Sequence, residues 1–315
     1  MPASAPQQFT VEKKDTGTRL QAFIAKRLWL SLSQTNRLLE SGAVSVDGHI
    51  AKREHKGHKI SAGQVIEITS FDRPGEERAV PNEKLHIEIL AEDDDEGWLV
   101  VNKPAGKPVH PLAASETDTV LNALIARYPD MHGVGEGALR SGVIHRLDVE
   151  TTGTLLFATK QAAWERLRKA FKKHRTTKLY RAIVHGKLRG KGSEKLHLVI
   201  AQHKPAKVRV VDASDAEGPG VRLCDLTWRA VKTFKHATLV EIDLGTGFLH
   251  QIRATFAHLG HPVVGDHHYG SQDSDSLRAD RPMLHASRLQ LEGIDVAAAI
   301  PADFAGLLES LREGR

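Results

Sequence analysis

The segment Gly142-Val-Ile-His145-Arg146-Leu147-Asp148-Val-Glu-Thr-Thr-Gly-Thr-Leu-Leu-Phe-Ala-Thr159 carries the strongest information about the fold. A short apolar run leads into a charged tetrapeptide, a polar turn and a strand-like run. An aspartate in a loop that feeds a buried strand is well placed to point into a cleft. Carboxylates act as nucleophiles or as acids and bases when a nearby cation orients them. On the tetrapeptide alone, however, an Asp–Arg pair that only fixes the loop is the simpler interpretation.

Strand-like runs dominate the sequence on both sides of this segment. They cover residues 87–90, 98–101, 154–159, 179–185, 196–200, 208–211 and 237–244. Helical patterns cover about 119–128, 161–174 and 250–259. Because the strands do not alternate one-for-one with helices, the sequence predicts an α+β domain on a mixed, largely antiparallel sheet.

The first 71 residues form a separate pattern. Apolar residues spaced by one helical face predict a helix: Leu20, Phe23, Ile24 and Leu28. A second helix runs through Leu38 and Leu39, and strands are expected at 43–46 and 64–69. The predicted organisation is a flexible tail over residues 1–14, a small α/β domain over 15–71, a polar linker over 72–86 and the large domain over 87–315.

Composition narrows the class of protein. The chain has 315 residues, a net charge of +5 and a pI near 9.2. Its single cysteine, Cys224, excludes an intramolecular disulfide and a cysteine-built zinc site. The sequence shows neither an apolar run long enough to span a membrane nor a signal peptide, so a cytoplasmic protein is expected. No helical histidine ligand pair and no nucleotide-binding loop occurs, so we expect neither a metal nor a cofactor; a monomer is the default expectation.

The N-terminal 15–71 region resembles the S4 RNA-binding module. The resemblance rests on Thr18-Arg19-Leu20, Phe23, Ser33, Arg37-Leu38-Leu39, Gly42-Ala-Val-Ser-Val-Asp-Gly48, Lys52 and Gly63-Gln-Val-Ile66. The resemblance implies that Arg37 and Lys52 lie on a face that grips structured RNA through its phosphates.

Five motifs appear in order along the large domain. They are Val101-Asn-Lys-Pro-Ala-Gly106 with His110-Pro111, His145-Arg-Leu-Asp148, Lys178-Leu-Tyr-Arg-Ala182, His250-Gln-Ile-Arg253 and Gly265-Asp266 with Tyr269-Gly270. Together they resemble the RluA family of RNA pseudouridine synthases over residues 87–292. Each motif is weak alone, but five in order are specific. His145 favours this family over the related RsuA type, which typically has glycine before Arg-Leu-Asp.

The resemblance implies a role for each matched residue. Asp148 matches the catalytic aspartate, and Arg253 matches the arginine that keeps this carboxylate ionised and oriented. Tyr180 matches the tyrosine that stacks on the target uracil, and Arg146 matches a residue near the vacated base position. Asp148 could act as nucleophile or as base at C2′, and the sequence does not choose between them.

A basic run over residues 166–181 contains no acidic residue, and this composition suggests a surface that binds RNA phosphates. An amphipathic helix here would bury one stripe and present a basic face, including Lys169, Lys172 and Lys173. A solvated surface is the usual meaning of a charge run, but this one leads directly to Tyr180. One departure from the family weakens the expected substrate grip, because Phe248 stands where an arginine is usual.

The function that these observations favour is isomerisation of a uridine in structured RNA, with large-subunit ribosomal RNA preferred over transfer RNA. The target base would be flipped out of its helix into the pocket. Two rivals share features of the site. One is a catalytically inert RNA-binding ribosome-assembly factor, which the presence of Asp148 and Tyr180 disfavours. The other is a glycosidase, which would release free uracil.

Overall fold

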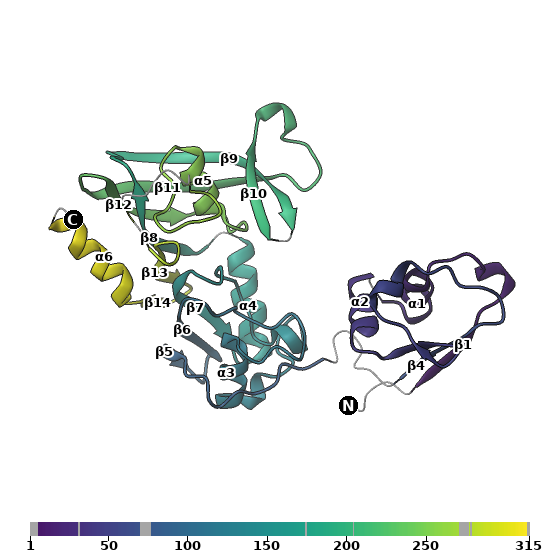
Figure 1. Cartoon of the computed structure of the whole chain (residues 1–315). Coiled ribbons are helices and arrows are strands. Elements are labelled where there is room, and N and C mark those ends of the chain that lie inside the picture. Colours follow the sequence, from purple (N-terminus) through teal and green to yellow (C-terminus); the bar gives the residue numbers. More distant parts are fainter. Residues whose placement is uncertain are drawn as a thin grey trace. The chain divides into compact units, whose positions relative to one another are not determined.

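The computed structural model describes residues 6–30, 32–69, 77–173, 175–203, 205–270, 277 and 279–313. Two compact units divide the chain, Met1–Arg78 and Ala79–Arg315 (Figure 1). No helix of the described residues is long and apolar enough to cross a membrane.

The first unit packs two helices on a small antiparallel sheet. Helices α1 (Leu20–Leu28) and α2 (Leu32–Glu40) contribute to its core together with a sheet of order β1-β4-β2-β3. The strands are β1 (Gln7–Thr10), β2 (Val44–Val46), β3 (His49–Ile50) and β4 (Val65–Ile68). The predicted helical face is confirmed, since Leu20, Phe23, Ile24 and Leu28 are buried. At the β2–β3 turn, Asp47 and Gly48 both have positive φ, 51° and 77°, as a two-residue hairpin requires.

Two predicted boundaries need correction. The tail predicted over residues 1–14 contains β1. This strand pairs along its length with β4, and Phe9 packs against the core of the unit. Of the linker predicted over residues 72–86, positions 72–76 lie outside the described residues. Its last part packs on the second unit, where Ala79 is buried and Asn82 bonds to the backbone of Thr117 and Asn122.

The second unit is built on one large sheet, of order β10-β9-β11-β12-β8-β13-β7-β6-β5 with β14 on β13 (Figure 1). Its strands are β5 (Glu88–Asp93), β6 (Trp98–Lys103), β7 (Thr152–Ala158), β8 (Thr177–His185), β9 (Lys191–His203), β10 (Ala206–Val211), β11 (Arg222–Thr233), β12 (Ala237–Leu244), β13 (Leu284–Leu291) and β14 (Ile294–Ala297). Among the described strands, β13 and β7 pair in parallel and the other pairs are antiparallel. The predicted mixed, largely antiparallel sheet is confirmed.

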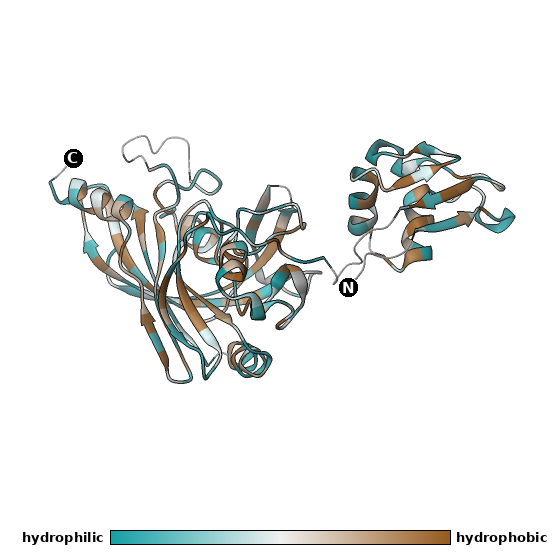
Figure 2. Ribbon diagram, turned by 90° about the horizontal axis from the view of Figure 1, so that it is seen from below, coloured by the Kyte–Doolittle hydropathy of each residue, from teal (hydrophilic) through white to brown (hydrophobic). Residues whose placement is uncertain are grey.

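Four helices of the second unit pack against this sheet: α3 (Val120–Arg127), α4 (Gln161–Lys172), α5 (Gln251–His258) and α6 (Ala302–Arg312). Thr119 caps α3 by accepting from the backbone of Asn122, which satisfies a donor that the first turn leaves unpaired. Helix α4 buries Ala163, Leu167 and Ala170 and leaves its charged side in solvent. Hydrophobic residues line the strands of the sheet and the helices against them (Figure 2).

The parallel pair β7–β13 fixes the end of the loop that carries Asp148. Gly153 pairs with Ala286 across this pair and has a φ of 113°. A Cβ at this position would lie 2.1 Å from the carbonyl oxygen of Ala286. Only glycine allows this approach of the two backbones, so the turn after Asp148 is anchored on the neighbouring strand.

Candidate active site

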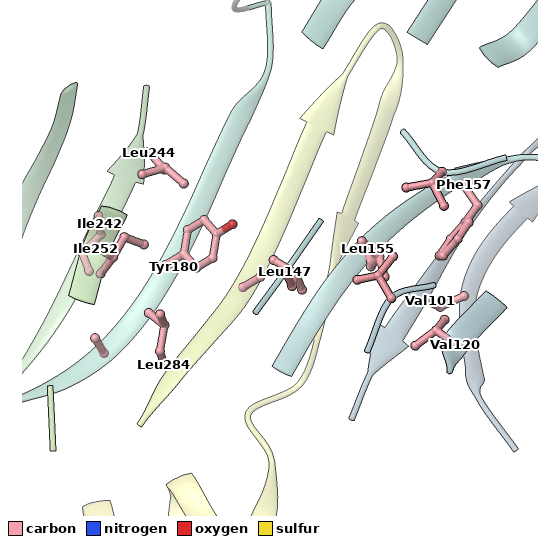
Figure 3. Close-up of a cluster of buried hydrophobic side chains, with 14 of the residues drawn as sticks. Val101, Val120, Leu147, Leu155, Phe157, Tyr180, Ile242, Leu244, Ile252 and Leu284 are labelled. Carbon is pink, nitrogen blue, oxygen red and sulfur yellow. The ribbon is translucent and has the colours of Figure 1, made fainter. Parts of the chain in front are cut away.

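A cleft of about 420 Å³ opens on the second unit where the Asp148 loop, α4, β8 and the start of α5 meet. Its walls combine charged and apolar side chains. They include His145, Arg146, Leu147, Asp148, Phe171, Lys172, Lys178, Tyr180, Leu244, Phe248, His250, Ile252, Arg253 and Leu284. Figure 3 shows Tyr180 with Leu244, Ile252 and Leu284 around it, and Leu147 on the side toward Leu155. The cleft is therefore built directly on the core.

Lys103, at the end of β6, organises the loop after Asp148. Its side chain is fully buried, and Nζ donates to the carbonyl oxygens of Pro104, Val149 and Thr151 at 2.8, 2.6 and 2.9 Å. Burial lowers the pKa of Lys103 to about 7, while Glu150 and Asp148 act to raise it. The three acceptors match the three N–H donors of an ammonium group, so Lys103 ties the Asp148 loop to the sheet.

Arg253, in α5, lies between two carboxylates. Its Nε and Nη2 donate to Asp266 at 2.7 and 2.8 Å, and its Nη1 lies 3.5 Å from Oδ2 of Asp148. Burial disfavours the charge of Arg253, but the hydrogen bonds and charge of Asp266 raise its pKa above the ordinary value. The structure thus brings Asp148 and Arg253 together as predicted, with Asp266 as the arginine's main partner.

Tyr180, in β8, forms the apolar floor of the cleft. It is 6% exposed and packs in the core with Ile252 and Leu284. Burial, with the charge of Asp148, raises the pKa of this phenol. Tyr180 therefore stays neutral at ordinary pH and offers a ring face and a hydroxyl group in the cleft that Asp148 also lines.

The residues before Asp148 are held by α4. Trp164 donates to the carbonyl of Val143 at 3.0 Å and Arg168 to that of Ile144 at 2.6 Å. His145 stacks on Phe171, with ring centroids 4.9 Å apart, and its Nε2 accepts from the backbone N–H of Leu156. Helix α4 thereby fixes the residues before Asp148, whereas Lys103 fixes those after it.

A second group of contacts reaches Asp148 from the start of α5. Nε2 of His250 lies 3.9 Å from Oδ2 of Asp148, and its Nδ1 lies 3.0 Å from the hydroxyl of Tyr269. This hydroxyl accepts from the backbone N–H of Val208 in β10. The ring of Tyr269 also faces the guanidinium of Arg253, at 5.2 Å.

The predicted basic residues divide by location. Arg146 is exposed at the cleft and Lys172 lines it, while Lys169 and Lys173 are exposed on the same helix. Within the part of the chain that the structure describes, none of these lysines has an ion-pair partner. Two arginines of the same helix, by contrast, form ion pairs. Arg166 pairs with Glu96 and Glu292, and Arg168 pairs with Glu136.

The two basic residues predicted in the N-terminal unit differ in exposure. Arg37 is half-buried and lies 3.7 Å from Glu77, whereas Lys52 is exposed.

Phe248 lines the cleft and packs with Leu198, Val208 and Tyr269 against the β9–β10 side of the sheet. Its backbone N–H donates to Oε1 of Gln251 at 3.0 Å. Phe248, which stands where an arginine is usual in the family, therefore packs against the strand pair β9–β10.

Sequence reasoning missed four residues of the site: Lys103, His250, Asp266 and Tyr269. Each lies inside a motif that identified the family. The motifs could therefore have pointed to these four residues, but the spacing of residues along the chain does not show which side chains contact one another in the fold. No group of three or more potential metal ligands occurs among the described residues.

Comparison with known proteins decides the family. The family model described as RNA pseudouridylate synthase matches residues 97–258. A curated RNA pseudouridine synthase of Synechocystis is 33% identical, covering 94% of this chain and 90% of that protein. The chain belongs to the RNA pseudouridylate synthase family of enzymes.

Other relatives carry more specific names. The ribosomal large subunit pseudouridine synthase D of Haemophilus ducreyi is 34% identical, over 90% of this chain and 87% of that protein. Its namesake from Vibrio parahaemolyticus is 32% identical, over 96% and 94%. Among solved structures, human RNA pseudouridylate synthase domain containing 4 superposes with a TM-score of 0.57 at 22% identity, over 71% of this chain and 93% of that one. This last likeness concerns the fold.

Proposed function

We propose that this chain converts a specific uridine of large-subunit ribosomal RNA to pseudouridine, with Asp148 as the catalytic carboxylate. The observation that carries the proposal is the meeting of Asp148, Arg253 and Tyr180 in one cleft. The ribosomal substrate is supported by the names of two relatives that align over most of their length. A cytoplasmic location accords with that substrate.

The reaction breaks the N1–C1′ bond, turns the uracil, joins C5 to C1′ and passes the C5 proton to solvent. Uracil leaves as an anion, so the sugar carbon needs a carboxylate beside it. Asp148 serves either as nucleophile at C1′ or as base at C2′. Arg253 holds one oxygen of Asp148, at 3.5 Å, and so orients the other toward the substrate.

The flipped uracil would stack on Tyr180, which the core holds rigidly. Flipping costs a few kcal/mol, and contacts to the RNA must offset this cost. Arg146, exposed at the cleft, is suited to fill the place that the base leaves.

Phosphate contacts are proposed on two surfaces. One is the solvent side of α4, with Lys169, Lys172 and Lys173. The other is the N-terminal unit, which we take to be an S4-like RNA-binding module with Arg37 and Lys52 as contacts. The helices and hairpin of this unit agree with the motif that suggested the module.

The test is tritium release from large-subunit ribosomal RNA transcribed with uridine labelled at C5. Wild type should release tritium, and Asp148→Asn should release none, because the amide is neither nucleophile nor base. Asp95→Asn, which changes an exposed turn far along the chain from the loop, is the control. Primer extension after carbodiimide treatment then locates the modified base.

Three outcomes would contradict the proposal. Full activity in Asp148→Asn would remove the carboxylate from the chemistry. Release of free uracil would mean a glycosidase. Modification of transfer RNA alone would leave the chemistry intact but overturn the ribosomal substrate.

A further inference from the structure

His250 has a left-handed backbone directly before α5. Its φ of 50° and ψ of 21° lie in a region that is uncommon for residues other than glycine, although histidine, asparagine and aspartate adopt it more often than other side chains do. The side chain is 12% exposed and lines the cleft. Strain of this kind persists only where surrounding contacts hold the residue, and here those contacts join His250 to Asp148 and Tyr269.

The hydrogen bonds of Tyr269 select the tautomer of His250. The Tyr269 oxygen accepts from the backbone N–H of Val208 at 2.8 Å, and Nδ1 of His250 lies 3.0 Å from the same oxygen. No other acceptor for the hydroxyl hydrogen occurs among the described residues, so it is donated to Nδ1. A neutral ring then carries its proton on Nε2, the nitrogen 3.9 Å from Oδ2 of Asp148.

The charges around the ring come from three segments of the chain. Asp148 faces it from the catalytic loop, Arg253 from α5, and Asp266 and His268 from the loop after α5. Burial lowers the pKa of His250, and the charge of Asp148 only partly opposes this effect. The ring is therefore neutral at ordinary pH, in agreement with the tautomer that the geometry selects.

We propose that His250 is a positioning residue for Asp148, directing its Nε2–H at the same carboxylate oxygen that Arg253 holds. This inference rests on the proposed catalytic role of Asp148. Nε2 of His250, at 3.9 Å, and Nη1 of Arg253, at 3.5 Å, face the same oxygen Oδ2, and contacts of this length tighten into hydrogen bonds when substrate binds. Both groups then restrict the carboxylate rotamer and leave Oδ1, which no side chain of the described residues occupies, for the sugar of the substrate. Tyr269 and the amide of Val208 set the tautomer and so act on Asp148 through His250.

Two substitutions separate positioning from a structural role. Glutamine can place its amide N–H where Nε2–H lies, whereas asparagine is too short to reach Asp148. Asparagine, however, tolerates the left-handed backbone better than glutamine. If His250 positions Asp148, His250→Asn loses kcat by roughly tenfold, because the N–H that would bond to the carboxylate in the substrate complex is lost. His250→Gln keeps most of kcat, and KM changes little in either variant.

Stability should follow the opposite order. His250→Asn is expected to resist unfolding at least as well as His250→Gln, because the backbone strain is smaller. A merely structural role predicts that kcat and stability fall together. The two roles therefore predict different rankings of the variants. Tritium release from the ribosomal RNA measures kcat, and urea unfolding of the same preparations measures stability.

Tyr269→Phe removes the group that sets the tautomer and should reduce kcat in wild type but not further in His250→Asn.

The outcomes are distinguishable. Wild-type kcat in His250→Asn overturns the positioning role while Asp148→Asn remains inactive. Absence of tritium release by wild type, or full release by Asp148→Asn, overturns the proposed function and this inference with it.

Discussion

Asp266 holds the guanidinium of Arg253 through two hydrogen bonds of 2.7 and 2.8 Å, and its side chain is completely buried. The same carboxylate accepts from the backbone N–H groups of His268 and Tyr269. The position of Arg253 relative to Asp148 is therefore set by Asp266, which also accepts from two backbone N–H groups. The longer contact to Asp148, at 3.5 Å, leaves that carboxylate accessible to substrate.

Replacing Asp266 by asparagine should both destabilise the protein and lower its activity. Breaking a buried ion pair leaves an uncompensated charge, which costs about 3–5 kcal/mol. The freed arginine can also turn fully onto Asp148, so kcat should fall. Urea unfolding and tritium release measure the two effects.

The pair Arg288–Asp295 provides a matched control for this prediction. It has the same two-bond geometry, at 2.7 and 2.6 Å, but both side chains are nearly half exposed. Asp295→Asn should change neither stability nor activity appreciably, since water screens the pair. Equal losses in the two variants would mean that burial does not explain the importance of Asp266.

Lys103 is expected to be essential for the shape of the catalytic loop. Lys103→Met fills the same space but leaves the carbonyls of Val149 and Thr151 without their buried donor. An unpaired buried polar group costs about 1–3 kcal/mol, so the free energy of unfolding should drop by a few kcal/mol and kcat should fall with it. The control is Lys160→Met, because Lys160 is exposed and reaches a single carbonyl, that of Asp95, at 3.2 Å. Similar effects of the two changes would refute the role of Lys103.

The fold was predictable where local patterns are strong. Helices α1, α3, α4 and α5 follow apolar spacing and lie within a few residues of the expected ranges. Strand β11 was missed, since its outward positions are charged and its pairing with β9 and β12 is a tertiary effect. The tail prediction failed at β1 because Gln7 and Gln8 appear polar, while the ladder with β4 compensates for them.

The site was predictable as a set of motifs but not as a network. The order of motifs is enough to bring Asp148, Tyr180 and Arg253 into consideration, and the structure places all three in one cleft. The pairing of Arg253 with Asp266 depends on how the loop over residues 259–270 turns back on α5, which no local spacing encodes. The left-handed backbone of His250 is likewise set by its tertiary contacts.

Tyr180→Phe should keep RNA binding and lose part of the activity. The ring remains to stack on uracil, so KM should stay near the wild-type value, whereas the neutral hydroxyl beside Asp148 is lost. Tyr180→Ala should in addition weaken binding, because base stacking on an aromatic ring contributes about 1–3 kcal/mol. Steady-state kinetics on ribosomal RNA separate the two effects, and a rise in KM equal in both variants would argue against stacking.

Replacing Lys169, Lys172 and Lys173 together by glutamine should weaken RNA binding and flatten its salt dependence. Each phosphate contact that is removed lowers the slope of log K against log salt by about 0.7–0.9. Arg166→Gln is the comparison, because Arg166 is already paired with Glu96 and Glu292 and should alter the slope less. Filter binding at several salt concentrations provides the slopes; an unchanged slope in the triple variant excludes α4 as a phosphate-binding surface.

The stability of the second unit should decrease in mild acid because of His145. Burial, with the charges of Lys178 and Arg168, lowers the pKa of His145 to about 3, so the ring is neutral in the folded state. In the unfolded chain, histidine has a pKa near 6.5. The contribution of His145 to the free energy of unfolding is therefore complete above that pH and is lost as the pH falls toward 3. Between pH 6.5 and 5 the loss should amount to about 2 kcal/mol.

His145→Gln isolates this contribution from that of the carboxylates, because a glutamine oxygen can still accept from the N–H of Leu156 but does not titrate. Tryptophan fluorescence can follow unfolding, since Trp98, Trp164 and Trp228 belong to the second unit. The difference in the free energy of unfolding between wild type and His145→Gln should therefore shrink by about 2 kcal/mol from pH 6.5 to 5. If the two curves run parallel over this range, the neutral state of the half-buried His145 is wrong, and with it the argument that α4 holds the Asp148 loop through an uncharged ring.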